Sequence, residues 1–185
     1  MKLNRVAEID GVRVNPIKST SDIRGSFSKF HPLNEIEDQL DTVAISFNPT
    51  IGTVRGLHFQ VEPFAEEKLI TCIQGSIFDV IVDLRPSSKT FGKWASLNLS
   101  STNRIQIYLP KGIAHGFQTL APNSIVHYCL TAEYAPDFSY VINPFGDLDI
   151  PWPLDTNNVS ERDRRGTTFS DASRKYAAAI GISQK

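Results

Sequence analysis

Residues 68–84, KLITCIQGSIFDVIVDL, decide the fold class of this 185-residue chain. Two apolar runs rich in β-branched residues flank the pair Gln74-Gly75, a two-residue turn signal, so this stretch predicts an antiparallel hairpin. Asp79 and Asp83 interrupt the second run at even spacing. Because side chains alternate across a strand, we expect the two carboxylates to share one face of it.

Similar short runs continue on both sides of residues 68–84. Each is rich in β-branched or aromatic residues and is bounded by turn residues, which is typical of antiparallel strands joined by tight turns. Many short strands at close spacing predict a sandwich or barrel. The further strands that we expect are residues 42–47, 54–60, 95–99, 105–109, 116–120 and 125–131.

Helical patterns are confined to two short segments. Residues 34–40 start at Asn34, a candidate N-cap, and residues 171–180 lie between Ser170, a candidate N-cap, and Gly181, a candidate stop signal. The fold class is therefore all-β, with a few short helices at the periphery.

Length and composition bound the class of protein. The chain carries 19 Lys+Arg and 20 Asp+Glu, a formal net charge of −1, which argues against a polycationic nucleic-acid binder. A chain of this length can bury a sizeable core without a disulfide or a structural metal, so we expect residues 1–185 to form one domain. Cys72 and Cys129 lie in strand-like apolar runs and are expected to be inert buried thiols.

The N-terminal residues and the charge-free stretches argue against export and membrane insertion. The run MKLNRVAEIDG contains charges at Lys2, Arg5, Glu8 and Asp10, where a secretory signal needs an unbroken apolar stretch. The longest charge-free stretch, residues 112–132, contains histidines, amides and hydroxyls and is too polar for a membrane span. We expect a soluble, cytoplasmic protein without a membrane partner.

Two histidines stand in runs whose spacings resemble the signatures of the cupin jelly-roll superfamily. His58 lies in GTVRGLHFQ, and His115 lies in PKGIAHGF. A metal-binding cupin needs three imidazoles and a carboxylate around one ion, but Gln60 takes the place of the second imidazole and Glu66 lies one residue beyond the carboxylate position. The resemblance therefore implies a cupin-like jelly-roll barrel, or double-stranded β-helix, without a transition-metal site.

Histidines that bind no metal are free for proton transfer near neutral pH. Arg24, Arg55 and Lys68 lie in the same stretches or close to them. Guanidinium groups bind a diphosphate bidentately, and an ammonium group stabilises a developing oxyanion. The alternative for each of these cations is a solvated surface charge.

A longer series of motifs resembles the dTDP-4-dehydrorhamnose 3,5-epimerase family. The motifs follow in order over about residues 20–165, and the combination of RGLHFQ with AHGF at this separation is specific. They are Asp22-x-Arg24-Gly25-x-Phe27, RGLHFQ, Lys68-Leu69, GSIFDVIVDLR, SKTFG, PKGIAHGF, Tyr128, Tyr134-x-Pro136, IPWP and Ser160-x-x-Asp163.

The resemblance implies a metal-free and cofactor-free enzyme, usually a homodimer, acting on a nucleotide-linked 4-keto-6-deoxy sugar. Abstraction of a C–H proton beside the ketone needs a base, a cation at the ketone oxygen and an acid on the opposite face. Carried over by motif, His58 is the base, Asp163 is its carboxylate partner, Lys68 stabilises the enolate oxygen and Tyr128 returns the proton. From the residues alone, Tyr128 could be a packing residue and Asp163 a surface ion-pair member.

The same carry-over supplies the substrate-binding residues. His115 contacts the sugar, Arg24 and Arg55 hold the diphosphate, and Phe27 and Gln60 complete the set. His127, beside Tyr128, is expected to face the other side of its strand as a structural residue. No clear role is expected for His31.

The chain departs from the family pattern at recognition positions, among them Lys29 and Glu133. Which nucleotide is carried, and whether C3, C5 or both are inverted, therefore stay open. Two alternatives in the same fold are a 3,4-ketoisomerase, which could dispense with Tyr128, and a non-catalytic sugar-binding cupin. A metal-dependent cupin is a third alternative, and Gln60 argues against it.

Overall fold

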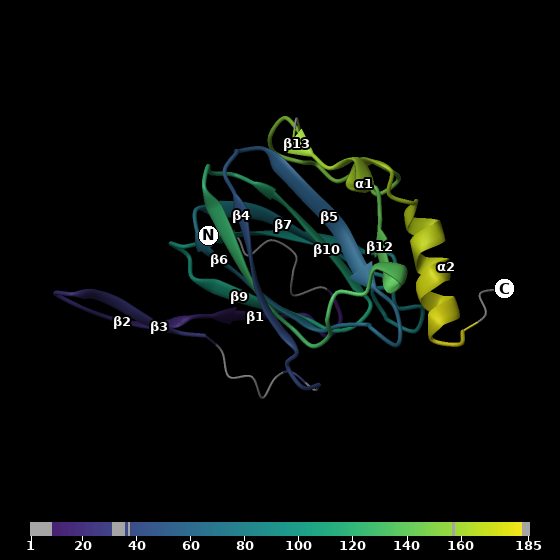
Figure 1. The fold of residues 1–185 in the computed structure, drawn as a ribbon, viewed down its shortest axis with the longest axis horizontal. Coiled ribbons are helices and arrows are strands. Elements are labelled where there is room, and N and C mark those ends of the chain that lie inside the picture. Colours follow the sequence, from purple (N-terminus) through teal and green to yellow (C-terminus); the bar gives the residue numbers. More distant parts are fainter. Residues whose placement is uncertain (1–8, 31–35, 37, 157, 183–185) are drawn as a thin grey trace.

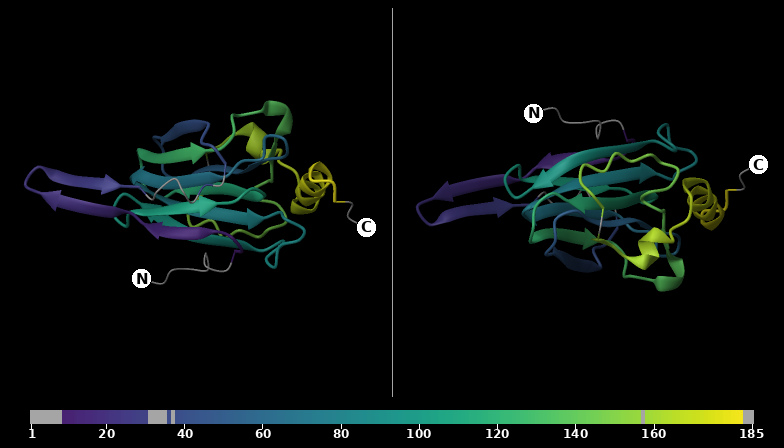
Figure 2. Two further views of the ribbon diagram at one scale, coloured as in Figure 1. Left: turned by 90° about the horizontal axis from the view of Figure 1, so that it is seen from below. Right: turned by 90° about the horizontal axis from the view of Figure 1, so that it is seen from above.

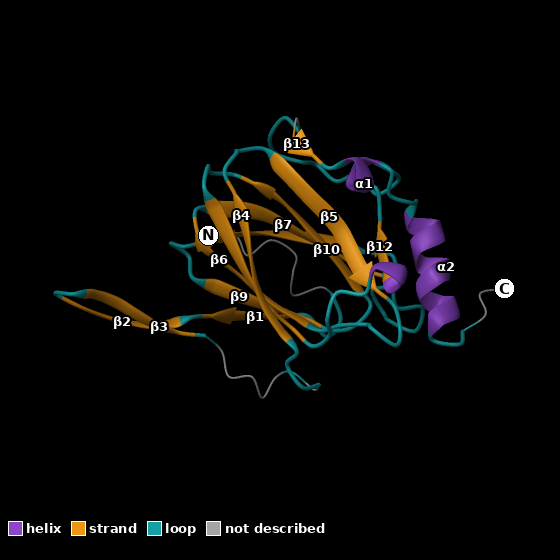
Figure 3. Cartoon of the chain, viewed as in Figure 1, coloured by secondary structure: helices purple, strands orange, loops and turns teal. Residues whose placement is uncertain are grey.

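A computed structural model describes residues 9–30, 36, 38–156 and 158–182 of the chain (Figure 1). The described part consists mainly of strands, with short helices near its C-terminal end (Figure 3). The strands are β1 (Arg13–Pro16), β2 (Lys18–Asp22), β3 (Gly25–Lys29), β4 (Thr42–Asn48), β5 (Thr53–Gln60), β6 (Lys68–Gln74), β7 (Ser76–Asp83), β8 (Trp94–Ser100), β9 (Ile105–Leu109), β10 (Ile113–Thr119), β11 (Ser124–Leu130), β12 (Ser139–Val141) and β13 (Asn158–Val159). The helices are the 3-10 helix η3 (Pro136–Phe138), α1 (Glu161–Arg164) and α2 (Phe169–Ala179).

Two sheets face each other and form a jelly-roll sandwich, which confirms the fold class expected from the sequence. One has the strand order β1-β9-β6-β11-β4, and the other has the order β12-β5-β10-β7-β8, with β13 added in parallel beside β5. The strands β2 and β3 pair with each other in a separate two-stranded sheet. This hairpin projects away from the body of the molecule (Figures 1 and 2).

The strands expected over residues 68–84 form, but the hairpin between them is wrong. β6 lies in the first sheet between β9 and β11, whereas β7 lies in the second sheet between β8 and β10. Gly75, with φ of +74°, turns the chain from one sheet to the other. Gln74-Gly75 is a turn, as its sequence predicts, but a local turn does not specify which strands pair across it.

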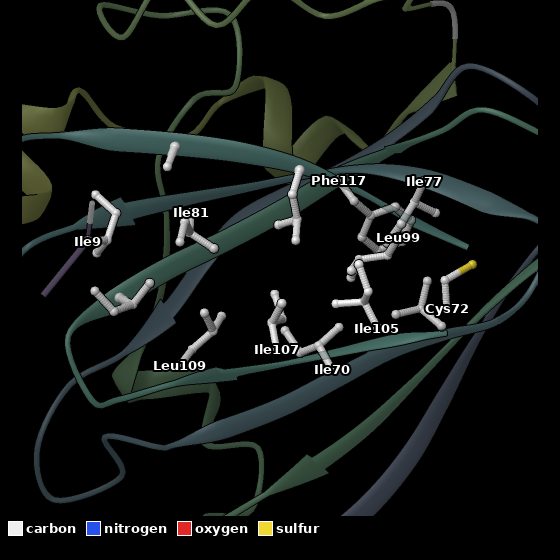
Figure 4. Close-up of a cluster of buried hydrophobic side chains, with 14 residues drawn as sticks. Ile9, Ile70, Cys72, Ile77, Ile81, Leu99, Ile105, Ile107, Leu109 and Phe117 are labelled. Carbon is white, nitrogen blue, oxygen red and sulfur yellow. The ribbon is translucent and has the colours of Figure 1, made fainter. Parts of the chain in front are cut away.

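The inner faces of the two sheets enclose the main apolar core (Figure 4). Ile70 from β6 and Ile107 from β9 meet Ile81 from β7 and Phe117 from β10, all of them at most 1% exposed. Asp79 lies between inward-facing residues of β7, so the two carboxylates of β7 share the inner face as predicted.

The outer face of the second sheet is covered by the C-terminal segment. Tyr176 and Ala172 of α2 pack on Leu57, Val80 and other buried residues of β5, β7 and β10. No helix in the described part of the chain is long and apolar enough to cross a bilayer.

The expected helix over residues 171–180 exists, but its N-cap is Thr168 and not Ser170. The Thr168 hydroxyl accepts a hydrogen bond from the backbone N–H of Asp171 at 3.1 Å, so the helix begins two residues earlier than expected. Gly181, with φ of +75°, follows its end as predicted.

Of the other expected helix, over residues 34–40, residues 34, 35 and 37 lie outside the described residues, as does His31. Residues 36 and 38–40 are described and are not helical.

Candidate active site

A histidine–aspartate pair joins the second sheet to the short helix α1. His58 Nε2 of β5 lies 2.8 Å from Asp163 Oδ1 of α1, although the residues are 105 positions apart in the sequence. An ionised carboxylate only accepts hydrogen bonds, so Nε2 carries the proton and Nδ1 is left as the basic nitrogen. The His58 side chain is 38% exposed, whereas that of Asp163 is 5% exposed. The pair therefore offers a base at a surface accessible to a ligand, with its carboxylate behind it.

Asp163 is held in place by its own helix and by β5. The Ser160 hydroxyl caps α1 by accepting from the backbone N–H of Asp163 at 3.1 Å, and the backbone N–H of Gly56 donates to Asp163 Oδ2 at 3.1 Å. Burial alone would raise the pKa of Asp163, but the hydrogen bonds from His58 and Gly56 and the charge of His58 lower it below its usual value. Asp163 is therefore ionised at neutral pH.

Two glycines explain why the two histidine motifs meet. A Cβ on Gly56 would lie 2.6 Å from the carbonyl oxygen of His115, and one on Gly116 would lie 2.6 Å from that of Arg55. Since no side chain fits there, β5 and β10 approach closely, and His58 lies directly opposite His115 in the register. The glycines of RGLH and AHGF are thus required by this contact between strands.

His115 belongs to a second histidine–aspartate pair, which is buried. Its Nε2 lies 2.7 Å from Oδ2 of Asp79 on β7, and the two side chains are 5% and 0% exposed. Asp79 Oδ1 is buried without a hydrogen-bond partner in the described part of the chain. Burial raises the pKa of Asp79, and the interaction with His115 offsets only part of this effect.

Tyr128 of β11 faces the same interior. Its ring lies edge-on to that of His115, with 6.1 Å between the centroids, and it packs against the core between the sheets. Burial and the nearby charge of Asp79 raise the pKa of Tyr128, so the phenol keeps its proton and can donate it. His127 faces the other side of the strand, where it stacks on Phe30 as expected of a structural residue.

Lys68 also faces this interior, because it lies two residues before the core residue Ile70 on β6 and side chains alternate along a strand. Ile70 pairs with Tyr128 on the neighbouring strand β11, so Lys68 lies diagonally next to Tyr128 on the same face. Its Nζ lies 2.8 Å from Glu66 Oε1. Lys68, His115 and Tyr128 thus come from three strands to one side of the space between the sheets.

Arg55 is oriented by an asparagine of the facing strand β4. Arg55 Nε donates to Asn48 Oδ1 at 2.7 Å, and the Asn48 amide group donates to the carbonyl oxygens of Ser46 and Ser124. Asn48 is 1% exposed. Within the described ranges no hydrogen bond or ion pair of the terminal nitrogens of Arg55 is found, so these nitrogens can donate to an anion.

A cavity of about 370 Å³ opens beside the first histidine–aspartate pair. Arg55, His58, Arg162 and Asp163 line it, together with residues of β13. The cavity therefore brings a guanidinium group, that of Arg55, together with a base, which fits a diphosphate attached to a carbon acid. The guanidinium group of Arg162 donates to the Tyr134 hydroxyl and to Ser139.

Three predicted substrate-binding residues, Gln60, Arg24 and Phe27, do not line the cavity beside His58. Gln60 is 5% exposed, and its amide nitrogen donates to the carbonyl oxygens of Phe64 and Glu133, each at 3.0 Å. Its side chain therefore holds two loops together. Arg24 and Phe27 lie on the projecting β2–β3 hairpin, away from the sheets, and Arg24 forms an ion pair with Asp22 at 2.5 Å.

Several members of the site were not identified from the sequence. Asp79 belongs to a quoted motif, but its pairing with His115 needs the antiparallel register of β7 and β10. The contacts of Asn48 and Arg162 join separate elements and carry no sequence signal of their own, and the cupin spacing that singles out Glu66 does not indicate its pairing with Lys68. In the described part of the chain no group of three or more His, Cys, Asp or Glu side chains could hold a metal ion.

Comparison with known proteins agrees with this geometry. The family model described as dTDP-4-dehydrorhamnose 3,5-epimerase matches residues 6–171. A protein of that name from Sinorhizobium fredii is 39% identical over 166 residues, covering 85% of this chain and 83% of the relative. The solved epimerase structure from Mycobacterium tuberculosis has a TM-score of 0.85 at 34% identity and covers 95% of this chain and 93% of that one.

A second solved structure carries a ligand. It is the dTDP-6-deoxy-D-glucose-3,5-epimerase of Legionella pneumophila in complex with dTDP-4-keto-L-rhamnose, with a TM-score of 0.82 and 32% identity, covering 88% of this chain and 90% of that one. The family model spans most of the chain and includes both histidine–aspartate pairs. The chain belongs to the dTDP-4-dehydrorhamnose 3,5-epimerase family.

Proposed function

We propose that this protein is an isomerase that inverts C3, C5 or both of a dTDP-4-keto-6-deoxyhexose in deoxysugar biosynthesis. The observation that carries the proposal is the His58–Asp163 pair beside a cavity that also presents Arg55 and Arg162. Membership of the family, and a relative whose solved structure holds dTDP-4-keto-L-rhamnose, support the choice of substrate.

In the proposed reaction, His58 removes the proton from the carbon beside the C4 ketone. The electron pair of the broken C–H bond moves to the ketone oxygen, and Lys68 stabilises the resulting enolate. Asp163 holds the imidazole in the basic tautomer and stabilises the charged ring. Tyr128 then donates its phenolic proton to the opposite face of the carbon, which inverts the stereocentre. The enolate electron pair forms the new C–H bond and the ketone is restored. His58 then releases the abstracted proton to water, and the Tyr128 phenolate takes up a proton from water.

In the same proposal the rest of the site binds the substrate. Arg55 holds the diphosphate, because Asn48 binds its Nε and, among the residues that the structure describes, no partner takes the terminal nitrogens. His115 contacts the sugar from β10, the strand that pairs with β5 beside His58. Gln60 acts by holding the loops at the end of β5, and the reaction uses neither a metal nor another cofactor.

We further propose a cytoplasmic homodimer in which residues 1–185 form a single domain. Two features support the dimer. Val43, Ile45 and Phe47 form a row of exposed apolar side chains on the outer face of the edge strand β4, each at least 54% exposed. The hairpin of β2 and β3, whose turn contains the predicted ligand Arg24 and whose second strand contains Phe27, projects from the body (Figure 2). This placement suits contact with a second copy of the chain.

Proton NMR of dTDP-4-keto-6-deoxyglucose in deuterated water tests the proposed function. Wild-type protein should exchange the C3 or the C5 proton, or both, and His58→Asn should exchange neither. Exchange at one carbon only would define a single-position epimerase. A folded wild-type protein that exchanges neither proton contradicts the proposal.

The variant Tyr128→Phe separates the epimerase from the 3,4-ketoisomerase. Loss of inversion with retained exchange supports Tyr128 as the acid on the opposite face. Unchanged inversion and exchange argue against Tyr128 as this acid, because another group must then deliver the proton to the opposite face.

A further inference from the structure

An ion pair lies behind the predicted enolate site. Lys68 Nζ is 2.8 Å from Glu66 Oε1, and the two side chains are 9% and 8% exposed. Glu66 lies in the segment just before β6, two residues from its partner. Neither the family motifs quoted above nor the reaction scheme gives Glu66 a role.

The burial of both groups makes this pair different from an ordinary surface salt bridge. An unpaired ammonium group is costly to bury, so the carboxylate compensates the charge of Lys68 before any substrate is present. An ammonium group has three hydrogens, and Glu66 takes one of them. In the described part of the chain Lys68 Nζ makes no other ion pair, so two hydrogens are left for a ketone oxygen.

The contact also restricts where the ammonium group can lie. A lysine side chain has four rotatable bonds and would otherwise sample several positions between the sheets. The site contains two other carboxylates that could attract it, Asp79 and Asp163. Glu66, just before β6, holds the Lys68 Nζ near the start of that strand and away from Asp79 and Asp163.

We infer that Glu66 is a positioning residue, which holds the ammonium group of Lys68 toward the C4 ketone of the substrate. The inference rests on the proposed function, since it assigns Lys68 to the enolate oxygen. Glu66 itself touches no reacting atom. Its effect should therefore be on the step that forms the enolate, with little effect on binding of the nucleotide diphosphate, which depends on Arg55.

Steady-state kinetics of deuterium incorporation separate these effects. Glu66→Ala removes the anion and its hydrogen-bond acceptor, and we expect kcat to fall about tenfold or more while KM changes less than threefold, because small displacements of a catalytic group are costly. Glu66→Gln keeps an acceptor of the same shape, so its loss of kcat should be smaller. Glu66→Gln also tests the inference by itself if Glu66→Ala does not fold.

Glu62→Gln is the matched control. It removes the charge of a glutamate in the same segment that lies 3.8 Å from Lys111 in a partly exposed pair. Its kcat should equal that of the wild type. Thermal unfolding of all variants reports folding separately, because a purely structural role of Glu66 would lower the melting temperature without changing kcat of the folded enzyme.

The outcomes are distinct. A kcat loss graded from alanine to glutamine at constant KM supports the inference. The inference is overturned if Glu66→Ala keeps the wild-type kcat, or if Glu66→Gln has a higher kcat than the wild type. It is also overturned if Glu62→Gln loses as much kcat as Glu66→Ala. If the wild type itself exchanges no proton, the proposed function fails, and the inference fails with it because Lys68 then has no ketone to face.

Discussion

The two histidine–aspartate pairs share one chemistry but differ in their surroundings. His58 is partly exposed beside a cavity, and hydrogen bonds lower the pKa of its partner Asp163. His115 is buried, and burial raises the pKa of its partner Asp79. A base must reach its substrate and needs an ionised partner, so the first pair suits proton abstraction and the second suits a fixed contact to the sugar.

Asp163→Asn tests the dependence of the base on its carboxylate. The amide cannot stabilise a protonated imidazole, so we expect the exchange rate to fall about 100-fold or more. Initial rates of deuterium incorporation measure the loss. Asp171→Asn, which removes an exposed carboxylate from α2, is the control and should keep the wild-type rate. An Asp163→Asn enzyme within threefold of the wild type would show that His58 acts without its partner.

The two candidate histidines could be selected from the sequence because their motifs are local. RGLH and AHGF each place a histidine next to a glycine whose absent side chain permits the approach of β5 to β10. The contact of Asn48 with Arg55 could not be predicted, because a single asparagine has no distinguishing neighbours in the sequence. Glu66 stands near the carboxylate position of the cupin signature, but that spacing does not indicate a pairing with Lys68. The contact of Asn48 joins two strands, and that of Glu66 depends on how the chain enters β6.

Asp83 gives a prediction for stability that is separate from catalysis. Burial alone would raise the pKa of Asp83, but hydrogen bonds from Arg85, Ser88 and Thr90 lower it below its usual value. A carboxylate with a lowered pKa contributes stability that is fully present above its pKa in the unfolded chain, about 3.9. This contribution is lost as the pH falls through the lower pKa of the folded state.

We therefore expect Asp83→Asn to lower the free energy of unfolding by about 3 kcal/mol at pH 7, as breaking a buried charge pair does. The difference from the wild type should stay constant down to about pH 5 and shrink below pH 4. Urea denaturation at a series of pH values measures it. A difference that grows on acidification would contradict the assignment of Asp83 as an ionised acceptor.

At the scale of elements, strands were easier to predict than their pairing. The apolar runs of β6 and β7 are local properties, and both strands form where expected. Their assignment to different sheets depends on the partners β9, β11, β8 and β10, which come later in the chain. β10 also begins at Ile113, before the expected residue 116, because its pairing with β7 extends to Asp83.

The helix α1 shows how a very short element can serve a site. It spans Glu161–Arg164, and its cap at Ser160 bonds to the backbone of the catalytic partner Asp163. A single turn has little intrinsic stability, so the cap and the packing of Asp163 on β5 must hold it. The strength of the cap therefore bears directly on the position of the carboxylate.

Ser160→Ala and Thr168→Ala compare two helix caps of the same chemistry. Each should cost about 1 kcal/mol of stability, because each removes a hydroxyl that accepts a backbone N–H bond. Only Ser160→Ala should also lower the exchange rate, by about tenfold, since only α1 carries a residue of the site. Chemical denaturation and initial rates measure the two effects. Equal rates in the two variants would show that β5 alone positions Asp163.

At the scale of the whole molecule, the predicted site is divided in space. The cluster around His58 lies on the sheets, whereas the hairpin with Arg24 and Phe27 projects from them (Figure 1). Side chains of the hairpin are strongly exposed, with Ile23 at 105% and Phe27 at 66%. Large exposed apolar groups are typical of an interaction surface, and the row on β4 offers a second such surface.

Mixing two inactive variants tests whether the hairpin serves the site of a second subunit. If it does, a heterodimer of His58→Asn with Arg24→Ala/Phe27→Ala contains one intact site, because the second subunit keeps His58 and receives an unaltered hairpin. Random pairing makes half of the dimers mixed, so co-refolded protein should recover about a quarter of the wild-type exchange rate. His58→Asn mixed with Asp163→Asn is the control and should recover nothing, since both residues belong to the site of one chain. Recovery no greater than in the control would mean that each hairpin acts within its own subunit or has no part in the reaction.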